Sequence, residues 1–150
     1  MLPTGFFINL HKALVIPVIV AAMIAFANFS IVMWLYLGLH GSYSILWLIK
    51  QRTYPDRRFA ETVPVLVGIL FVFLPLAAYY AAPVLLAWLH PEVPGWAVAV
   101  GVSAFTFGIF LHFVSDAQKF YTLKVQTGLI DTGLFARTRN PNYLGEILTY

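Results

Sequence analysis

The chain has 150 residues, of which 61% are hydrophobic and 10% are charged, and it contains no cysteine. A soluble domain has about 25% charged residues, so this composition excludes an ordinary soluble protein and predicts an integral membrane protein. The formal charge of +3 comes from nine basic and six acidic residues; in a membrane protein such an excess reports loop orientation rather than nucleic-acid binding. The absence of cysteine also excludes disulfides and thiolate chemistry.

The first two predicted helices come from an almost unbroken apolar run over residues 13–49. A single helix of that length would measure about 55 Å, whereas the hydrocarbon core of a bilayer is about 30 Å thick. The run must therefore turn. We place the turn at 28–30, between a span over about residues 10–27 and a second over about 31–49. Pro17 predicts a kink in the first span unless neighbouring groups take up the freed carbonyl.

Two further spans follow the polar loop KQRTYPDRRFAE. The third, over residues 63–89, is interrupted by Pro75 and Pro83. The fourth runs over about residues 96–114 and is predicted to continue as a helix past Asp116.

A fifth helix is predicted to begin near Asn142, and only about two turns of it remain before the sequence ends, whereas a membrane helix needs about 20 residues. We therefore expect an all-α polytopic membrane helix bundle with four complete transmembrane helices and the start of a fifth. It would form a single membrane domain over residues 1–150 that is incomplete at its C-terminus.

The basic residues predict how the chain is oriented. With four spans, the loop at residues 50–58 and the polar residues of the last third fall on the same side of the membrane. By the positive-inside rule this side is cytoplasmic. We therefore expect a multi-pass protein in which the basic loops and any cofactor site face the cytoplasm.

Charged, amide and glycine residues crowd together only over residues 112–146. His112, Ser115, Asp116 and Lys119 are spaced at i, i+3, i+4 and i+7 and share one helical face. Ionisable groups at the membrane boundary are candidates for function. The alternative is a purely structural cluster, in which Asp116 pairs with Lys119 and nothing binds.

The next loop brings Arg137 and Arg139 close to a helix that starts beside Pro141. A helix N-terminus next to two guanidinium groups predicts a site for a phosphate or a carboxylate. Glu146 lies one turn beyond Asn142 and would accept a hydrogen bond from a ribose or an amine, or else pair with Arg139. The alternative for both arginines is contact with lipid headgroups.

The run GLFARTRNPNYLGE resembles the signature G-L-[WF]-x-x-[ST]-R-H-P-N-Y-x-G-E of the membrane family that contains the bacterial DUF1295 proteins and the steroid 5-alpha-reductase C-terminal domain. The upstream SDAQK resembles a second element of that family. The block LHGSYSILWLIKQRTYPDRRF, residues 39–59, is similar to a block of the bacterial members.

The resemblance implies a helix bundle whose cytoplasmic half encloses NADPH and whose membrane cavity admits a flat lipid such as a sterol. The implied reaction is hydride transfer to an activated carbon–carbon double bond of a lipophilic substrate. Positions that match the cofactor pocket of the steroid reductases are Asp116, Asn142, Glu146 and, between the last two, Gly145. Positions that match the bacterial signature are Lys119, Arg139 and Tyr143.

The chain departs from the family pattern at three points, of which one is that we expect the family's last helices, which complete the cofactor pocket, to be missing after Tyr150. Asn140 stands where the signature has histidine, and the acid and tyrosine that polarise the substrate carbonyl in the steroid enzymes have no clear counterpart. Among the residues of the second span, we expect Tyr43 and His40 to be the catalytic donors. His40, Tyr43 and Trp47 share a helical face, and the alternative is that this aromatic stripe serves packing.

Two other functions stay open. One is an S-adenosylmethionine-dependent methyltransferase of the isoprenylcysteine carboxyl methyltransferase type, which is similar in fold and has an R-H-P-x-Y-x-G element; SDAQK and the Asn142–Tyr143 pair favour the reductase. The other is a non-catalytic membrane protein with a lipid-binding groove.

Several other kinds of site are disfavoured by the sequence. Four scattered histidines argue against a metal site. No Rossmann or P-loop motif is present. The oligomeric state is left open.

Overall fold

The computed structural model describes all 150 residues, and it is helical apart from loops and one short pair of strands. Four helical segments are long and apolar enough to cross a membrane, which confirms the predicted all-α class and the four spans: Thr4–Ala25, Ile31–Thr53, Val65–Leu89 and Gly95–Val125. The chain forms two compact units, Met1–Glu92 and Val93–Tyr150, here called unit 1 and unit 2. The single domain proposed from the sequence stays a prediction.

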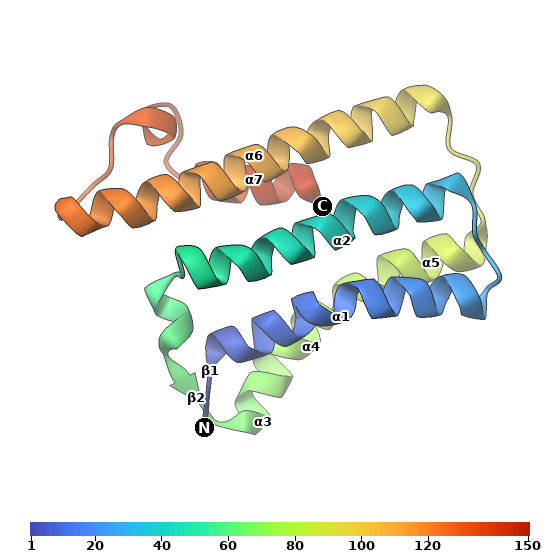
Figure 1. Ribbon diagram of the computed structural model, residues 1–150, viewed down its shortest axis with the longest axis horizontal. Coiled ribbons are helices and arrows are strands. Elements are labelled where there is room, and N and C mark those ends of the chain that lie inside the picture. Colours follow the sequence, from blue (N-terminus) through green and yellow to red (C-terminus); the bar gives the residue numbers. More distant parts are fainter. The chain divides into compact units, whose positions relative to one another are not determined.

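The first two helices of unit 1, α1 (Thr4–Ala25) and α2 (Ile31–Thr53), are antiparallel (Figure 1). Helix α1 starts earlier than predicted because its beginning is tied to the loop after α2. Strand β1 (Leu2–Pro3) pairs antiparallel with β2 (Thr62–Val63), and the backbone N–H of Thr4 donates to the Glu61 carbonyl at 2.8 Å. Two-residue strands leave no periodic pattern, so this ladder cannot be predicted from the sequence.

The predicted turn between the first two spans is confirmed, and Asn28 holds it in place. Asn28 is 2% exposed, and its Nδ2 donates to the carbonyls of Ala87 and Leu86 at 3.1 and 3.3 Å. Its Oδ1 accepts from the Ser30 N–H at 3.1 Å. One side chain therefore closes the turn and joins it to the third span.

The third span is a chain of short helical pieces: α3 (Val65–Gly68), η2 (Ile69–Phe73), α4 (Leu74–Ala77), η3 (Ala78–Tyr80) and α5 (Ala81–Leu89). The prolines explain the breaks, since neither has an N–H to donate to the carbonyl four residues earlier. The wider π turn η2 precedes Pro75, and the tighter 3₁₀ turn η3 precedes Pro83. By contrast, Pro17 lies inside a continuous α1.

The core of unit 1 lies where α1, α2 and α5 meet. Its buried members are Val15, Ile19, Ala22, Met23, Met33 and Ala87. A polar contact continues this packing: the Tyr80 hydroxyl donates to the His11 carbonyl at 2.7 Å, and the two rings stack at 4.8 Å. Between α2 and β2, the short helix η1 (Arg57–Ala60) is capped by Asp56, which accepts from the Arg58 N–H.

Unit 2 contains α6 (Gly95–Val125), η4 (Gly133–Ala136) and α7 (Pro141–Thr149). Helix α6 continues past Asp116 as predicted, and α7 starts at Pro141, one residue before the predicted position. Helix α7 runs back along α6, as Figure 1 shows. The residues of the last third therefore gather on two packed helices and the loop that joins them.

Candidate functional site

Two glycines allow α6 and α7 to pack closely. A Cβ atom added to Gly145 would lie 2.5 Å from the His112 backbone nitrogen, and one added to Gly108 would lie 2.7 Å from the Gly145 carbonyl oxygen. Backbones that approach this closely tolerate no side chain at the contact. The structure thus gives Gly145, one of the predicted cofactor-pocket residues, a role in helix packing.

The close contact brings His112 of α6 against the first turns of α7. His112 is 2% exposed. Its Nδ1 lies 3.7 Å from Glu146 Oε1 and 3.4 Å from the carbonyl oxygen of Asn142, and its Nε2 lies 3.9 Å from Asp116 Oδ2. We call these four residues the His112 centre. It brings together three predicted cofactor residues, Asp116, Asn142 and Glu146, and Glu146 faces His112 rather than Arg139.

The remaining basic residues of the prediction line a separate cavity of unit 2, which we call the basic pocket. Its volume is about 700 Å³, and its polar lining includes Lys119, Arg137, Arg139, Asp131 and Asn140. The apolar lining comes from Leu123, Leu129, Ile130 and Phe135. Three basic side chains and one acid give this cavity a positive character, and Asn140 places the start of α7 at its edge.

Gln118 shapes the loop around the basic pocket, a role that was not predicted from the sequence. Its Nε2 donates to the Thr132 carbonyl at 2.8 Å, and its Oε1 accepts from the Leu134 N–H at 3.1 Å. Between these contacts Gly133 has a φ of +59°, a conformation that favours glycine. The glutamine of the SDAQK element was the only available signal, and a loop contact cannot be read from spacing.

The other predicted residues lie outside these two groups. Tyr143 is on α7 and is 54% exposed. In unit 1, His40 stacks on Tyr36 at 4.1 Å, and Tyr43 is 2% exposed with the ammonium group of Lys12 4.4 Å above its ring. These contacts favour the packing interpretation for the aromatic stripe of α2, and the catalytic roles of His40 and Tyr43 stay predictions.

The relationship of the chain to known proteins rests on one family match. No curated protein and no solved structure matches the chain. The family described as "Protein of unknown function (DUF1295)" matches residues 14–150, which include the His112 centre, the basic pocket and the second half of α1. The chain therefore belongs to the DUF1295 family, as its C-terminal motifs predict.

Proposed function

We propose that the protein is a membrane-embedded reductase that binds NADPH through unit 2 and reduces an activated carbon–carbon double bond of a lipid or steroid-like enone. The observation that carries the proposal is the basic pocket, in which Lys119, Arg137 and Arg139 line one cavity of about 700 Å³. Ligand pockets in proteins typically measure about 300–1,000 Å³, so the cavity is large enough for much of a nucleotide.

The charge of the pocket favours NADPH over S-adenosylmethionine. NADPH carries a pyrophosphate and a 2′-phosphate, whereas S-adenosylmethionine carries no phosphate and has a cationic sulfonium. Arg137 and Arg139 are exposed and form no ion pair or side-chain hydrogen bond within the chain. Their guanidinium groups are thus available for bidentate contacts with phosphate oxygens.

The His112 centre suits the uncharged parts of the same ligand. The carboxylates of Asp116 and Glu146 are acceptors for ribose hydroxyls and for a carboxamide. Asp116 lies one turn before Lys119 on α6, and Asn142 is close to Asn140 at the start of α7. The proposed cofactor would therefore extend along the two helices, with its phosphates in the basic pocket and a ribose at the His112 centre. Tyr143 stays a proposed contact near this ribose.

Bound NADPH would supply hydride to the electrophilic carbon of the substrate. The protein's part is then to hold the cofactor and to polarise the conjugated carbonyl with a hydrogen-bond donor. His40 and Tyr43 of α2 stay our proposed donors. A lipophilic substrate would enter from the bilayer, and the cofactor would enter from the cytoplasm, as the distribution of basic residues favours.

The test is a binding titration of the purified protein in detergent with NADPH, NADH and S-adenosylmethionine, read as a thermal shift. A ligand that binds the folded state raises its stability by mass action. We expect NADPH to stabilise the protein, and Arg137→Gln and Arg139→Gln each to weaken its binding by about tenfold, as the loss of a charge-assisted hydrogen bond predicts.

Lys124→Gln is the matched control. Lys124 lies in the last turn of the same helix as Lys119 and packs over Phe120 at 4.3 Å, and it does not line the pocket. Its loss removes the same charge and should leave NADPH binding nearly unchanged. Stabilisation by S-adenosylmethionine alone would refute the reductase and favour the methyltransferase, and no shift with either ligand would favour the non-catalytic protein.

A further inference from the structure

Unit 1 buries two lysine side chains beside one tryptophan. Lys12 of α1 is 6% exposed and Lys50 of α2 is 3% exposed, although lysine is seldom buried to this extent. The Nζ atoms of Lys50 and Lys12 lie 4.7 and 5.4 Å from the centre of the Trp47 ring, and Lys12 also lies over the ring of Tyr43. We call Lys12, Tyr43, Trp47 and Lys50 the lysine seam.

The lysine seam is held in place from two sides. The Trp47 Nε1 donates to Asn9 Oδ1 of α1 at 3.3 Å. On the other side, Phe59 of η1 lies 6.0 Å from the Trp47 ring and 5.8 Å from Lys50 Nζ. Cation–π contacts and this hydrogen bond fix both ammonium groups before any ligand arrives, which lowers the ordering cost of binding.

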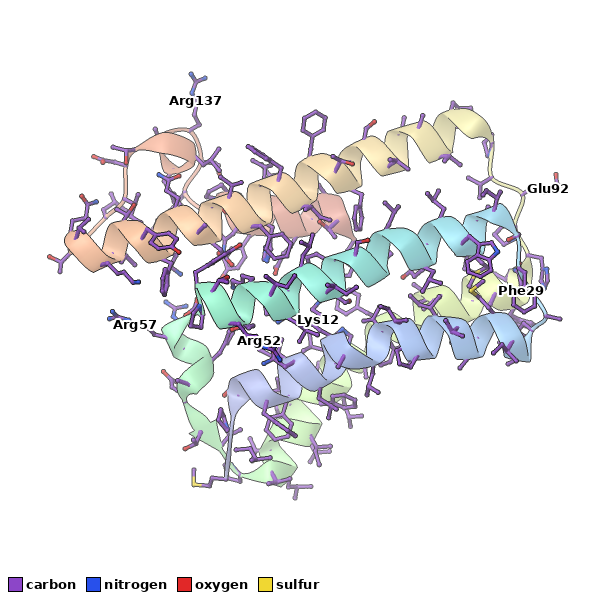
Figure 2. All side chains as sticks on the ribbon, viewed as in Figure 1. Lys12, Phe29, Arg52, Arg57, Glu92 and Arg137 are labelled. Carbon is purple, nitrogen blue, oxygen red and sulfur yellow. The ribbon has the colours of Figure 1, made fainter.

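The surrounding charge at this end of unit 1 is positive. Its basic residues are Lys12, Lys50, Arg52, Arg57 and Arg58, and its acidic residues are Asp56 and Glu61. The third acid of the unit, Glu92, lies at the opposite end, as the labels of Arg57 and Glu92 in Figure 2 show. An excess of basic side chains at the end of a membrane helix attracts anionic lipid headgroups.

A buried hydroxyl supplies a second, independent observation. Ser44 is 2% exposed, and its Oγ has no hydrogen-bond partner. Other helical hydroxyls in the chain donate to the carbonyl one turn earlier, as Thr106 does to Val102 and Thr149 does to Gly145. An unpartnered buried hydroxyl is unfavourable because it has lost its contacts with water and gained none in the protein, and a ligand oxygen would remove this cost.

Ser44 lies level with Lys12 along the α1–α2 pair. Trp47 contacts Asn9, and a Cβ atom on Gly41 would contact Ile16. These two contacts fix the antiparallel register of the helices and place Ser44 opposite the turn that carries Lys12. The free hydroxyl and the ammonium group therefore occupy the same level of the lysine seam.

The same stretch of α2 also presents an apolar surface. Ile45, Leu46 and Ile49 are 50%, 40% and 52% exposed. Leu46 lies beside Lys50 at the edge of the lysine seam, and Ile45 and Ile49 lie farther around the outer face of α2. A lipid whose headgroup reaches the seam would therefore lay its acyl chain around this outer face, whereas a small soluble anion would use only the charged part.

We infer that the lysine seam binds the anionic headgroup of a membrane lipid, a phosphate or a carboxylate. Lys12 and Lys50 provide the cationic donors, and Ser44 provides a neutral donor. The acyl chain lies along Ile45, Leu46 and Ile49. This site uses only unit 1 and does not depend on the nucleotide proposed for unit 2.

The test titrates delipidated protein in neutral detergent with phosphatidylglycerol, phosphatidylcholine and sn-glycerol 1-phosphate. The readouts are the thermal shift and the bound lipid counted by native mass spectrometry, and no nucleotide is added. We expect phosphatidylglycerol to stabilise the protein more than phosphatidylcholine does. Lys12→Gln and Lys50→Gln should each weaken phosphatidylglycerol binding by about tenfold.

Arg52→Gln is the matched control, because Arg52 is exposed and lies two residues from Lys50 on α2. It should change the affinity by less than about twofold, as expected for an exposed charge. If the lysine variants do not fold, Ser44→Ala provides the test, since it removes one hydroxyl and should lower the affinity by about threefold or more.

Three results would overturn the proposal. An equal loss of phosphatidylglycerol affinity in Arg52→Gln and Lys50→Gln would show that the overall positive charge attracts the lipid and that the lysine seam does not bind it specifically. Equal stabilisation by phosphatidylcholine would show that binding does not require an anionic headgroup. An equal effect of sn-glycerol 1-phosphate would keep an anion site but overturn a lipid as its source.

Discussion

The imidazole of His112 on α6 lies 3.7 Å from the carboxylate of Glu146 on α7. Asp116 approaches the other ring nitrogen at 3.9 Å, so the ring has an acid on each side. The two acids differ in access: the Glu146 side chain is 40% exposed, and that of Asp116 is 11% exposed. Glu146 is therefore the acid of the His112 centre that is best able to reach a bound ligand while it contacts His112.

This difference leads to a prediction for two acids of unit 2. Glu146→Gln should weaken NADPH binding by about tenfold, because a neutral amide replaces a charged acceptor for a ribose hydroxyl. Asp131→Asn should strengthen binding, because it removes the one acid that lines the basic pocket and repels phosphate there. Equilibrium titration with NADPH checks both.

The two variants control for each other, since each removes one negative charge from the same unit. A general electrostatic effect would strengthen NADPH binding in both. Tighter binding by Glu146→Gln would therefore contradict a direct contact between Glu146 and the ribose.

The glycine contact between α6 and α7 predicts a packing defect. In Gly145→Ala the new Cβ would lie 2.5 Å from the His112 backbone nitrogen, so the helices must move apart. We expect a loss of about 1–3 kcal/mol, as in other overpacked sites. Hydrogen exchange of residues 141–149 should rise, which mass spectrometry can follow.

Gly101→Ala is the control on the same helix α6, because nothing lies within 4 Å of its added Cβ. It should leave stability unchanged or raise it by up to about 1 kcal/mol through helix propensity. Equal destabilisation of the two variants would show that the loss of stability comes from replacing any glycine of this unit and not from the close contact between α6 and α7.

The sequence predicted the spans well because hydropathy over some twenty residues is a strong signal. It also placed the turn at Asn28, since a run twice the bilayer thickness must reverse. The β1–β2 ladder, which starts α1 at Thr4, and the division of the third span into α, π and 3₁₀ pieces could not be predicted. Strand pairing over two residues depends on tertiary contacts rather than on periodicity. The same is true of the type of helical turn that forms before each proline.

For the candidate site, spacing and resemblance selected residues that the structure separates into two groups. Spacing along α6 predicted that Asp116 shares a face with His112, and the geometry agrees. It could not predict that Lys119 lines the basic pocket, because the position of the loop is set by Gln118 and by the positive φ of Gly133. Such contacts join residues about fifteen positions apart and leave no local pattern.

Gln118 leads to a prediction for the loop of the basic pocket. Gln118→Ala removes its hydrogen bonds to the Thr132 carbonyl and the Leu134 N–H. We expect a local loss of about 1–3 kcal/mol, and therefore about tenfold or faster hydrogen exchange at the Leu134 amide. NMR or mass spectrometry checks this rate.

Gln126→Ala is the control, since Gln126 is exposed at the end of α6 and its side chain forms no hydrogen bond. In the Gln126→Ala variant, the Leu134 amide should exchange at the wild-type rate. An unchanged rate in Gln118→Ala would mean that the loop is held without the glutamine.

Asn28 leads to a prediction for the stability of unit 1. Asn28→Ala removes the donor to the carbonyls of Leu86 and Ala87 and the acceptor for the Ser30 N–H. Ala87 is fully buried, so its carbonyl cannot turn to water. We expect a loss of about 1–3 kcal/mol, measured as a lower midpoint of thermal unfolding in detergent.

The neighbouring Phe29→Ala is the control, because Phe29 is 55% exposed in the same turn. Asn28→Asp keeps the acceptor for Ser30 and loses both donor bonds, and it also buries a carboxylate beside two carbonyl oxygens, so it should be at least as destabilising as Asn28→Ala. If Asn28→Asp matches the wild type while Asn28→Ala does not, the turn is stabilised by its own Ser30 contact and not by its attachment to α5.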